Sequence, residues 1–326
     1  PPPPSRTAQR EGEIEMRPPV MFFLCFASVV SAHLAPAIPL PGSFNQKEYS
    51  LATIAPAKEQ ISLEPGAVAG ITTGAFMLAG VALGCAPQTL AGLMTGAIVT
   101  APVNILDIAI MENASGKRKL GPALTHGIQR LSSDPVGFAK SPESSLVYTL
   151  FACTYATANI CKHIKLPTVP FLIATTAANM GSCFYKDSEL ARLCGTTEKK
   201  EFPLLSYACL AARDTLAMGS SFTLPPILGK VMAGFGAPSA FANNFAQLFT
   251  PVAAQTVQVP FHLMALSLYN QPQLSLPERV TSLKALYTET LWARMARVLP
   301  CYGAGGVINN SLKARLAGAS LAAATK

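Results

Sequence analysis

Long apolar runs, interrupted by few charged side chains, dominate the pattern along this chain. Residues 65–106 contain no Lys, Arg, Asp, Glu or His, and residues 231–277 contain only His262 among these types. A helix that crosses a bilayer needs about 20 predominantly apolar residues. Each run is therefore long enough for one or two membrane helices.

Apolar length and turn residues together predict six membrane helices, near 88–111, 144–161, 168–185, 203–229, 240–269 and 290–312. A further apolar segment at 66–86 precedes them and ends at the turn sequence GCAP. We favour a separate span for this segment over the early part of one long first helix. Its Gly66, Gly70 and Gly74 have a small-xxx-small spacing that lets helix backbones approach closely in lipid.

The connections between the six spans alternate between long and short, which indicates three helical hairpins. The first long connection, 112–142, is rich in Lys and Arg, so the positive-inside tendency places it on the side where insertion began or in the matrix. The long connections also contain amphipathic pieces. Val280, Leu283 and Tyr287 share one helical face, which predicts a membrane-surface helix, with an ordinary loop helix as the alternative.

Composition and charge agree with an all-α membrane protein. Half of the 326 residues are hydrophobic and 13% are charged, whereas soluble domains carry about 25% charged residues. The net charge of +8 is spread along the chain without interleaved aromatics, so we expect a lipid bilayer and not a nucleic acid as partner. Eight scattered cysteines without a CxxC pair, and four distant histidines, argue against a zinc site or a disulfide scaffold.

The chain divides into three predicted parts. Residues 1–63 form a targeting or flexible segment, residues 64–316 form the transmembrane helical domain, and residues 317–326 form a C-terminal tail. Within the first part, 16–32 combines a basic residue, an apolar core and small residues, and it resembles a secretory signal peptide. A plain amphipathic targeting or linker segment is the alternative.

Charged residues inside the predicted spans are the strongest functional signal. Arg213 and Asp214 stand side by side in the apolar stretch LAARDTLAMGSSFTLPP. A charge at the bilayer centre costs at least about 2.5–3.5 kcal/mol on insertion scales, so such residues usually face a bundle interior. Arg213 is therefore predicted to contact an anionic substrate group, with Asp214 orienting it. The alternatives are a structural interhelical pair or a position at the membrane interface.

Two more arginines, Arg294 and Arg297, lie three residues apart on one helical face. If the helices surround one cavity, they form a cluster of three guanidinium groups with Arg213. Guanidinium binds carboxylate and phosphate in bidentate fashion, which suits a small metabolic anion. Trp292 beside them is typical of a membrane boundary, so interfacial positions remain the alternative.

Other polar residues in the spans have open interpretations. His262 follows Pro260 and is either a proton-linked switch, a replacement for a gating acid, or a neutral histidine bonded to a carbonyl that the proline frees; we prefer the last. Asp107, with Asn104, either pairs with Lys186 or another helix end, or is a solvated helix terminus.

Three sequence pieces resemble signatures of the mitochondrial carrier family. APVNILDIAIMEN around Pro102 and QVPFHLMALSLYNQP around Pro260 are similar to its proline-kinked odd-helix signature, and ARMARVLPCYGAGGVINN is similar to its even-helix pattern. The pair Arg213–Asp214 resembles a substrate contact point of the family's fourth helix. The resemblance covers roughly residues 88–312.

The resemblance implies a six-span bundle of three helical hairpins around a central cavity, with one extra N-terminal span possible. It implies substrate contacts at Arg213, Asp214, Arg297 and Arg294, and gating or helix-bending roles for Pro102, Asn104, Asp107, Pro260 and His262. The acid positions of the signature read Asn104 and His262, and the third span lacks the signature proline. A complete ionic gate is therefore not implied.

The function predicted from these features is transport of a small anionic metabolite through the central cavity, in the mitochondrial inner membrane. The alternative function is a non-transporting adaptor or structural subunit of an organellar membrane complex, with membrane-complex partners. The signal-like segment leaves the plastid envelope or endomembrane as alternative locations. We predict no enzyme activity, catalytic residue, metal or cofactor, because nucleophile-elbow, Walker and HExxH motifs are missing from the sequence; GAGG, 303–306, is interpreted as helix packing.

Overall fold

The computed structural model describes residues 64–114, 118–193, 203–270 and 272–324, and all regular structure in these ranges is helical. The prediction of an all-helical fold is therefore confirmed for these ranges. The predicted N-terminal segment lies outside the described residues. Two helical segments, Pro65–Ala82 and Ala86–Ala109, are long and apolar enough to cross a membrane, so a bundle of six membrane-crossing helices stays a prediction.

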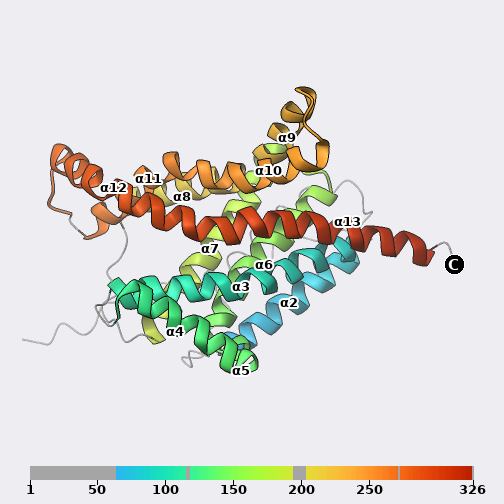
Figure 1. Ribbon diagram of the computed structural model, residues 1–326, viewed down its shortest axis with the longest axis horizontal. Coiled ribbons are helices and arrows are strands. Elements are labelled where there is room, and N and C mark those ends of the chain that lie inside the picture. Colours follow the sequence, from blue (N-terminus) through green and yellow to red (C-terminus); the bar gives the residue numbers. More distant parts are fainter. Residues whose placement is uncertain (1–63, 115–117, 194–202, 271, 325–326) are drawn as a thin grey trace, which may run out of the picture.

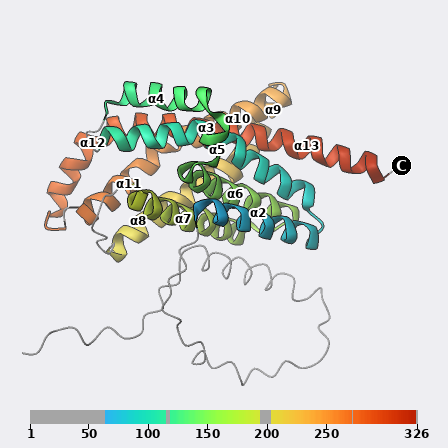
Figure 2. The same ribbon diagram turned by 90° about the horizontal axis from the view of Figure 1, so that it is seen from below.

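The first half of the domain begins with two separate apolar helices, α2 (Pro65–Ala82) and α3 (Ala86–Ala114). Gly84 joins them with a φ of +66°, a left-handed conformation that glycine adopts without a steric penalty. The helices that follow are α4 (Leu120–Ser133), α5 (Pro135–Lys140), α6 (Pro142–His163) and α7 (Thr168–Leu193). Figure 2 shows α4, from the first long connection, lying alongside α3.

The second half contains helices that π-helical segments interrupt. Its elements are α8 (Leu204–Met218), η1 (Gly219–Thr223), α9 (Leu224–Gly234), α10 (Ser239–Ala253), α11 (Gln255–Asn270), α12 (Leu276–Val298), η2 (Leu299–Ala304) and α13 (Gly305–Ala324). α12, η2 and α13 form one continuous helix, which we call the rod. Figure 1 shows it running from α12 to α13, and Figure 2 shows the first turns of α12 set at an angle to the rest. The helix predicted around Val280 is present but is not separate, because these residues form the first turns of α12; its place at a membrane surface stays a prediction. The rod also continues past residue 316, into the predicted tail.

The helices pack against one another in a closed ring. α3 packs on α6, α6 on α7, and α7 on α8. α8 then packs on α11, α9 packs on α10, and α11 packs on α12. The rod then closes the ring, because α13 packs on α3. α2 lies outside this ring, against α6 and α3. Side chains on the inward faces of α3, α7, α8, α11 and α12 can therefore meet one another.

α6 forms the centre of the hydrophobic core and makes very close contact with α3. Added Cβ atoms would lie 2.7 Å from the Ala156 nitrogen at Gly92 and 2.7 Å from the Ala152 nitrogen at Gly96. Glycine is required at both positions because any larger side chain meets backbone. The close approach predicted for the glycines of α2 is wrong at Gly70 and Gly74, since an added Cβ would meet nothing within 4 Å there.

The π-helical segment η1 depends on two consecutive prolines, Pro225–Pro226, at the start of α9. Proline has no N–H, so the carbonyls of Ser221 and Phe222, four residues earlier, lose their normal helical donors. Gln247 Nε2 donates to the Ser221 carbonyl at 3.0 Å, and Lys162 Nζ donates to the Phe222 carbonyl at 2.7 Å. Side chains from α10 and α6 thus replace the missing backbone hydrogen bonds.

The second π-helical segment, η2, is held by some of the same helices. The same Gln247 Nε2 donates to the Tyr302 carbonyl at 3.1 Å, and the Tyr155 hydroxyl of α6 donates to the Cys301 carbonyl at 2.6 Å. The interpretation of GAGG as helix packing agrees with this region, because a Cβ at Gly306 would overlap Gln247. π-Helical segments inside α-helices occur frequently at functional sites.

Candidate functional site

Arg213 and Asp214 on α8 form an ion pair that points toward α11. Arg213 Nε donates to Asp214 Oδ1 at 2.7 Å, and Arg213 Nη1 lies 3.1 Å from His262 Nδ1. A guanidinium group can only donate, so Nδ1 must accept, which leaves a neutral imidazole with its proton on Nε2. The Arg213 side chain is 13% exposed and that of Asp214 is 4% exposed. Neither group faces lipid.

The second carboxylate oxygen of Asp214 is left without a partner. Oδ2 is buried and accepts no hydrogen bond from any residue that the structure describes. A buried carboxylate oxygen in this state has a large unmet demand for a hydrogen-bond donor. It is therefore a candidate contact for a positively charged group of a ligand.

Asp107 of α3 is the centre of a second set of ionic contacts. Arg297 of α12 donates to it from Nε at 2.6 Å and from Nη2 at 3.1 Å, and Lys186 Nζ of α7 donates to it at 3.3 Å. The Asp107 side chain is only 8% exposed. The structure thus has the Lys186 pairing that the sequence allowed, and not the solvated helix terminus. One carboxylate joins three helices.

Arg294 differs from the other two arginines in the charge of its partner. Its Nε donates to the amide oxygen Oε1 of Gln255 at 2.9 Å. Among the described residues, no carboxylate lies within ion-pair distance of Arg294, whereas Arg213 and Arg297 each contact an aspartate. The positive charge of Arg294 is therefore the least compensated of the three.

These groups converge on one region between the helices, which we call the basic cluster: Asp107, Lys186, Arg213, Asp214, Gln255, His262, Arg294 and Arg297. His262 lies within electrostatic range of all three arginines, and Arg294 lies within range of Asp214. Four cationic side chains face two carboxylates here. This excess of positive charge favours a ligand with an anionic group.

Three other residues with predicted gating roles lie elsewhere or bond differently. Pro102 and Pro260 are exposed, and buried Asn104 donates to the Ser144 hydroxyl of α6 at 2.8 Å. The neutral imidazole that we preferred for His262 agrees with Nδ1 as an acceptor, but its predicted partner is wrong. The carbonyl that Pro260 frees, at Thr256, accepts from the Tyr287 hydroxyl at 3.0 Å, and the imidazole contacts Arg213.

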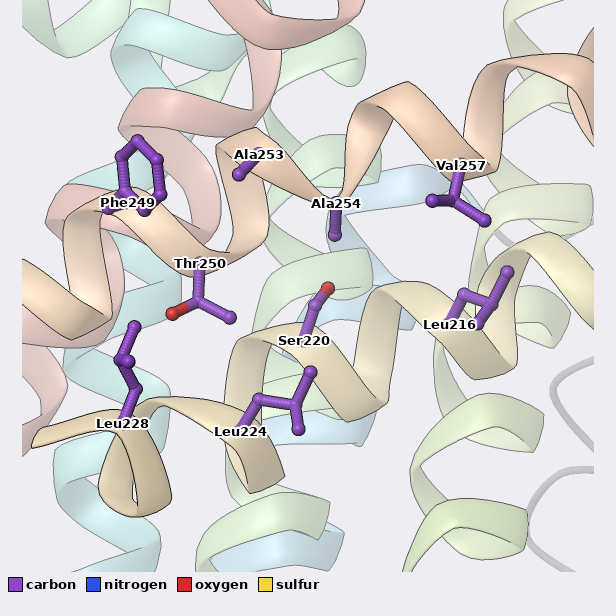
Figure 3. Close-up of a pocket in the computed structure, with 9 residues that line it drawn as sticks. All are labelled: Leu216, Ser220, Leu224, Leu228, Phe249, Thr250, Ala253, Ala254 and Val257. Atoms are coloured by element: carbon purple, nitrogen blue, oxygen red, sulfur yellow. The ribbon is translucent and has the colours of Figure 1, made fainter. Parts of the chain in front are cut away.

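Two grooves lie outside the basic cluster. An apolar groove of about 360 Å³ runs between α8–η1–α9 and α10–α11, and Figure 3 shows Ser220 and Leu224 facing Thr250 and Ala254 across it. A smaller groove of about 170 Å³ lies between α3, α4, α5 and α6. The arginines line neither groove. Hydrogen bonds and ion pairs among its own side chains hold the basic cluster together.

Comparison with known protein families decides the assignment of the chain. Residues 91–317, more than two thirds of its length, match the model of a family described as "probable citrulline exporter". The chain belongs to this family. No curated protein and no solved structure matches the chain.

Membership of the exporter family corrects the resemblance to mitochondrial carriers, which is wrong. The proline and arginine signatures that suggested it are short, and they occur here in a different family. Membership supports a membrane protein that transports a small solute, with lipid as its surroundings. The inner-membrane location rested on the carrier resemblance and stays a prediction.

Sequence reasoning missed two members of the site region, Gln255 and Gln258. They lie three residues apart on α11, and both are fully buried, with exposures of 1% and 0%. The signal that could have found them is their position in the charge-free run 231–277, where a polar amide must find partners inside the protein. Attention to charged residues alone left them out.

Proposed function

We propose that the protein exports a small zwitterionic amino acid of the citrulline type, which binds at Arg294 and Asp214. Citrulline carries an α-carboxylate, an α-ammonium group and a neutral ureido group. The carboxylate would bind the Arg294 guanidinium, and the ammonium group would donate to Asp214 Oδ2. The family description supplies the candidate substrate and the direction of transport.

The observation that carries this proposal is the presence, in one site, of two groups of opposite charge that can each take a further hydrogen bond from a ligand. Arg294 has only a neutral partner, at Gln255 Oε1, and Asp214 Oδ2 has no partner among the described residues. The two side chains are within electrostatic range of each other. An amino acid zwitterion presents the matching pair of charges, and hydrogen bonds to charged groups contribute roughly 1.5–3 kcal/mol each.

The remaining ion pairs have a supporting role in this proposal. Arg297 makes a bidentate contact with Asp107, and Lys186 contacts the same carboxylate. These pairs tie α3, α7 and α12 together beside the site. Their release would let the helices separate, so that the bound solute could leave on one side of the membrane.

A small dicarboxylate is the second candidate substrate class. It is favoured by the excess of cationic over anionic side chains in the basic cluster. A dicarboxylate would use Arg294 but would be repelled by the unpaired oxygen of Asp214. The two candidates therefore differ in whether Asp214 promotes or opposes binding.

The test is uptake into liposomes that contain the purified protein, with labelled citrulline, ornithine and malate as alternative substrates. We expect citrulline uptake to exceed both others, and Arg294→Gln to reduce it at least about tenfold, the effect of losing a charged hydrogen bond. Arg315→Gln, at an exposed position of α13, is the matched control and should behave as wild type.

The Asp214→Asn variant separates the two candidates. We expect it to reduce citrulline uptake, because a neutral amide no longer attracts the ammonium group. The wild-type protein could instead take up malate and no citrulline, with malate uptake increasing in Asp214→Asn. That result would show that the substrate is a dicarboxylate and not a zwitterion. A protein that moves neither solute above the level of empty liposomes would refute the proposed function.

A further inference from the structure

Gln255 stands at the start of a chain of side-chain hydrogen bonds that ends on η1. Its Nε2 donates to Gln258 Oε1 at 2.9 Å and to the Pro251 carbonyl at 3.2 Å. Gln258 Nε2 then donates to the Ser220 hydroxyl at 3.4 Å, and that hydroxyl donates to the Ala217 carbonyl at 3.0 Å. Each donor in this chain has an acceptor.

This chain fixes which end of the Gln255 amide faces Arg294. A guanidinium group can only donate, so it requires the amide oxygen, and the amide nitrogen is turned toward Gln258 Oε1. Reversing the amide would place two donors against each other at Arg294. The buried neighbours therefore hold an acceptor in front of Arg294 Nε.

The atom by which each arginine is held determines what the rest of its guanidinium can do. Arg297 uses Nε and Nη2 on Asp107, and Arg213 uses Nε on Asp214 and Nη1 on His262. Among the residues that the structure describes, Arg294 is held through Nε alone. Both of its terminal nitrogens remain for a carboxylate ligand, which guanidinium binds in a two-bonded fork.

We infer that Gln255 is a positioning residue that makes Arg294 the carboxylate-binding group of the site. The neutral amide orients the guanidinium group without neutralising its charge. The other two arginines of the basic cluster each contact an aspartate instead. This inference rests on the proposed function and deepens it. It assigns the selection of substrate charge to an uncharged side chain.

The test replaces the amide by a carboxylate of the same size. In Gln255→Glu the new carboxylate neutralises Arg294, so we expect the KM for citrulline to rise at least tenfold and the ratio of citrulline to ornithine uptake to fall. Thr256→Glu adds the same charge one residue further on, at an exposed position, and serves as the matched control. We expect it to keep the wild-type KM and ratio.

A second variant separates positioning from a merely structural role. Gln255→Met removes the acceptor but adds no charge, so we expect its KM to rise less than that of Gln255→Glu. A structural role gives the opposite order, because glutamate keeps a bond to Arg294 and methionine does not. That opposite order, an unchanged substrate ratio, or a Gln255→Glu protein that does not fold would overturn the inference.

Binding of acetate, a bare carboxylate, gives a readout that does not require transport. Acetate should raise the unfolding temperature of the wild-type protein and of Thr256→Glu relative to chloride, and it should not raise that of Gln255→Glu. Equal shifts in all three proteins would overturn the inference about Gln255 even if citrulline is transported. If citrulline is not transported but acetate shifts the unfolding temperatures as expected, the proposed function is refuted and the inference about Gln255 stands.

Discussion

We call the close contact of α3 with α6 at Gly92 and Gly96 the seam. The seam and the basic cluster join helices in opposite ways. At the seam, Gly92 and Gly96 bring the backbone of α3 against the backbone of α6, where all residues from Ser144 to Cys161 except Tyr148 are buried. At the basic cluster, polar side chains join the helices: Asp107 joins α3 to α7 and α12, His262 joins α11 to α8, and Gln255 joins α11 to α12. One contact is between main chains, and the other is between side-chain ends.

The difference indicates which part of the molecule can change shape. A seam of main-chain contacts has no side chains that can rotate, so it moves as one rigid piece. Ion pairs can exchange partners while the helices separate, especially when a ligand offers a competing carboxylate. We therefore expect α3 and α6 to form a static base during transport, and the helices that carry arginines to move against it.

The largest effect is expected from a side chain inserted into the seam. Gly96→Leu would place atoms inside the Ala152 backbone, where a Cβ alone would lie 2.7 Å from the nitrogen. We expect a loss of stability in the exceptional range above about 4 kcal/mol, measured as loss of monodisperse, folded protein in detergent. Gly70→Leu, where an added Cβ meets nothing within 4 Å, is the control. Equal stability of the two variants would contradict the rigid seam.

The next largest effect is expected from removal of the shared carboxylate. Asp107→Asn removes the carboxylate that Arg297 and Lys186 share, and breaking a buried pair costs about 3–5 kcal/mol. Because the Arg297 side chain is 25% exposed and can reach water, we expect about 3 kcal/mol, read from thermal unfolding. Adding Arg297→Gln should recover part of this loss. A double variant less stable than Asp107→Asn would show that charge is not the cause.

The smallest effect is expected from a neutral pair beside the seam. Asn159 of α6 and Asn309 of α13 exchange hydrogen bonds of 2.8 and 3.0 Å. A cycle of Asn159→Leu, Asn309→Leu and the double variant should give a coupling energy of about 1 kcal/mol, typical of side-chain pairs in membranes. A coupling larger than that of Asp107 with Arg297 would reverse the order of the two regions.

The apolar pattern predicted most helix positions, because burial in lipid or core requires apolar length, but the span predicted at 240–269 is two helices, α10 and α11. It could not predict the continuous rod from α12 to α13. The polar residues around Val280 suggested a separate surface helix, whereas helical bonding simply continues through them. The pattern also gave no sign of η1, which depends on donors from Gln247 and Lys162, both distant from η1 in sequence.

The candidate site was predictable where it consists of charges. Arg213 and Arg297 were found because a charge in an apolar run must face inward, and the structure brings them together with Arg294. The contact between Arg213 and the adjacent Asp214 was predicted, but the partner of Arg297 was not predictable from spacing, since Asp107 lies far from Arg297 in sequence. Gln255 escaped notice because a neutral residue in an apolar run draws no attention.

Gln247 donates one hydrogen bond to η1 and one to η2, and the two segments differ in how much they need it. Pro225 can never supply an N–H to the Ser221 carbonyl, so that oxygen always needs Gln247. The Tyr302 carbonyl is different, because it also accepts from the Gly305 N–H. Both segments involve a proline, since Pro300 in η2 leaves the Ala296 carbonyl without its α-helical donor. One extra residue turns everything after it by about 100° around the helix axis, so each proline sets which face the following helix presents to its neighbours.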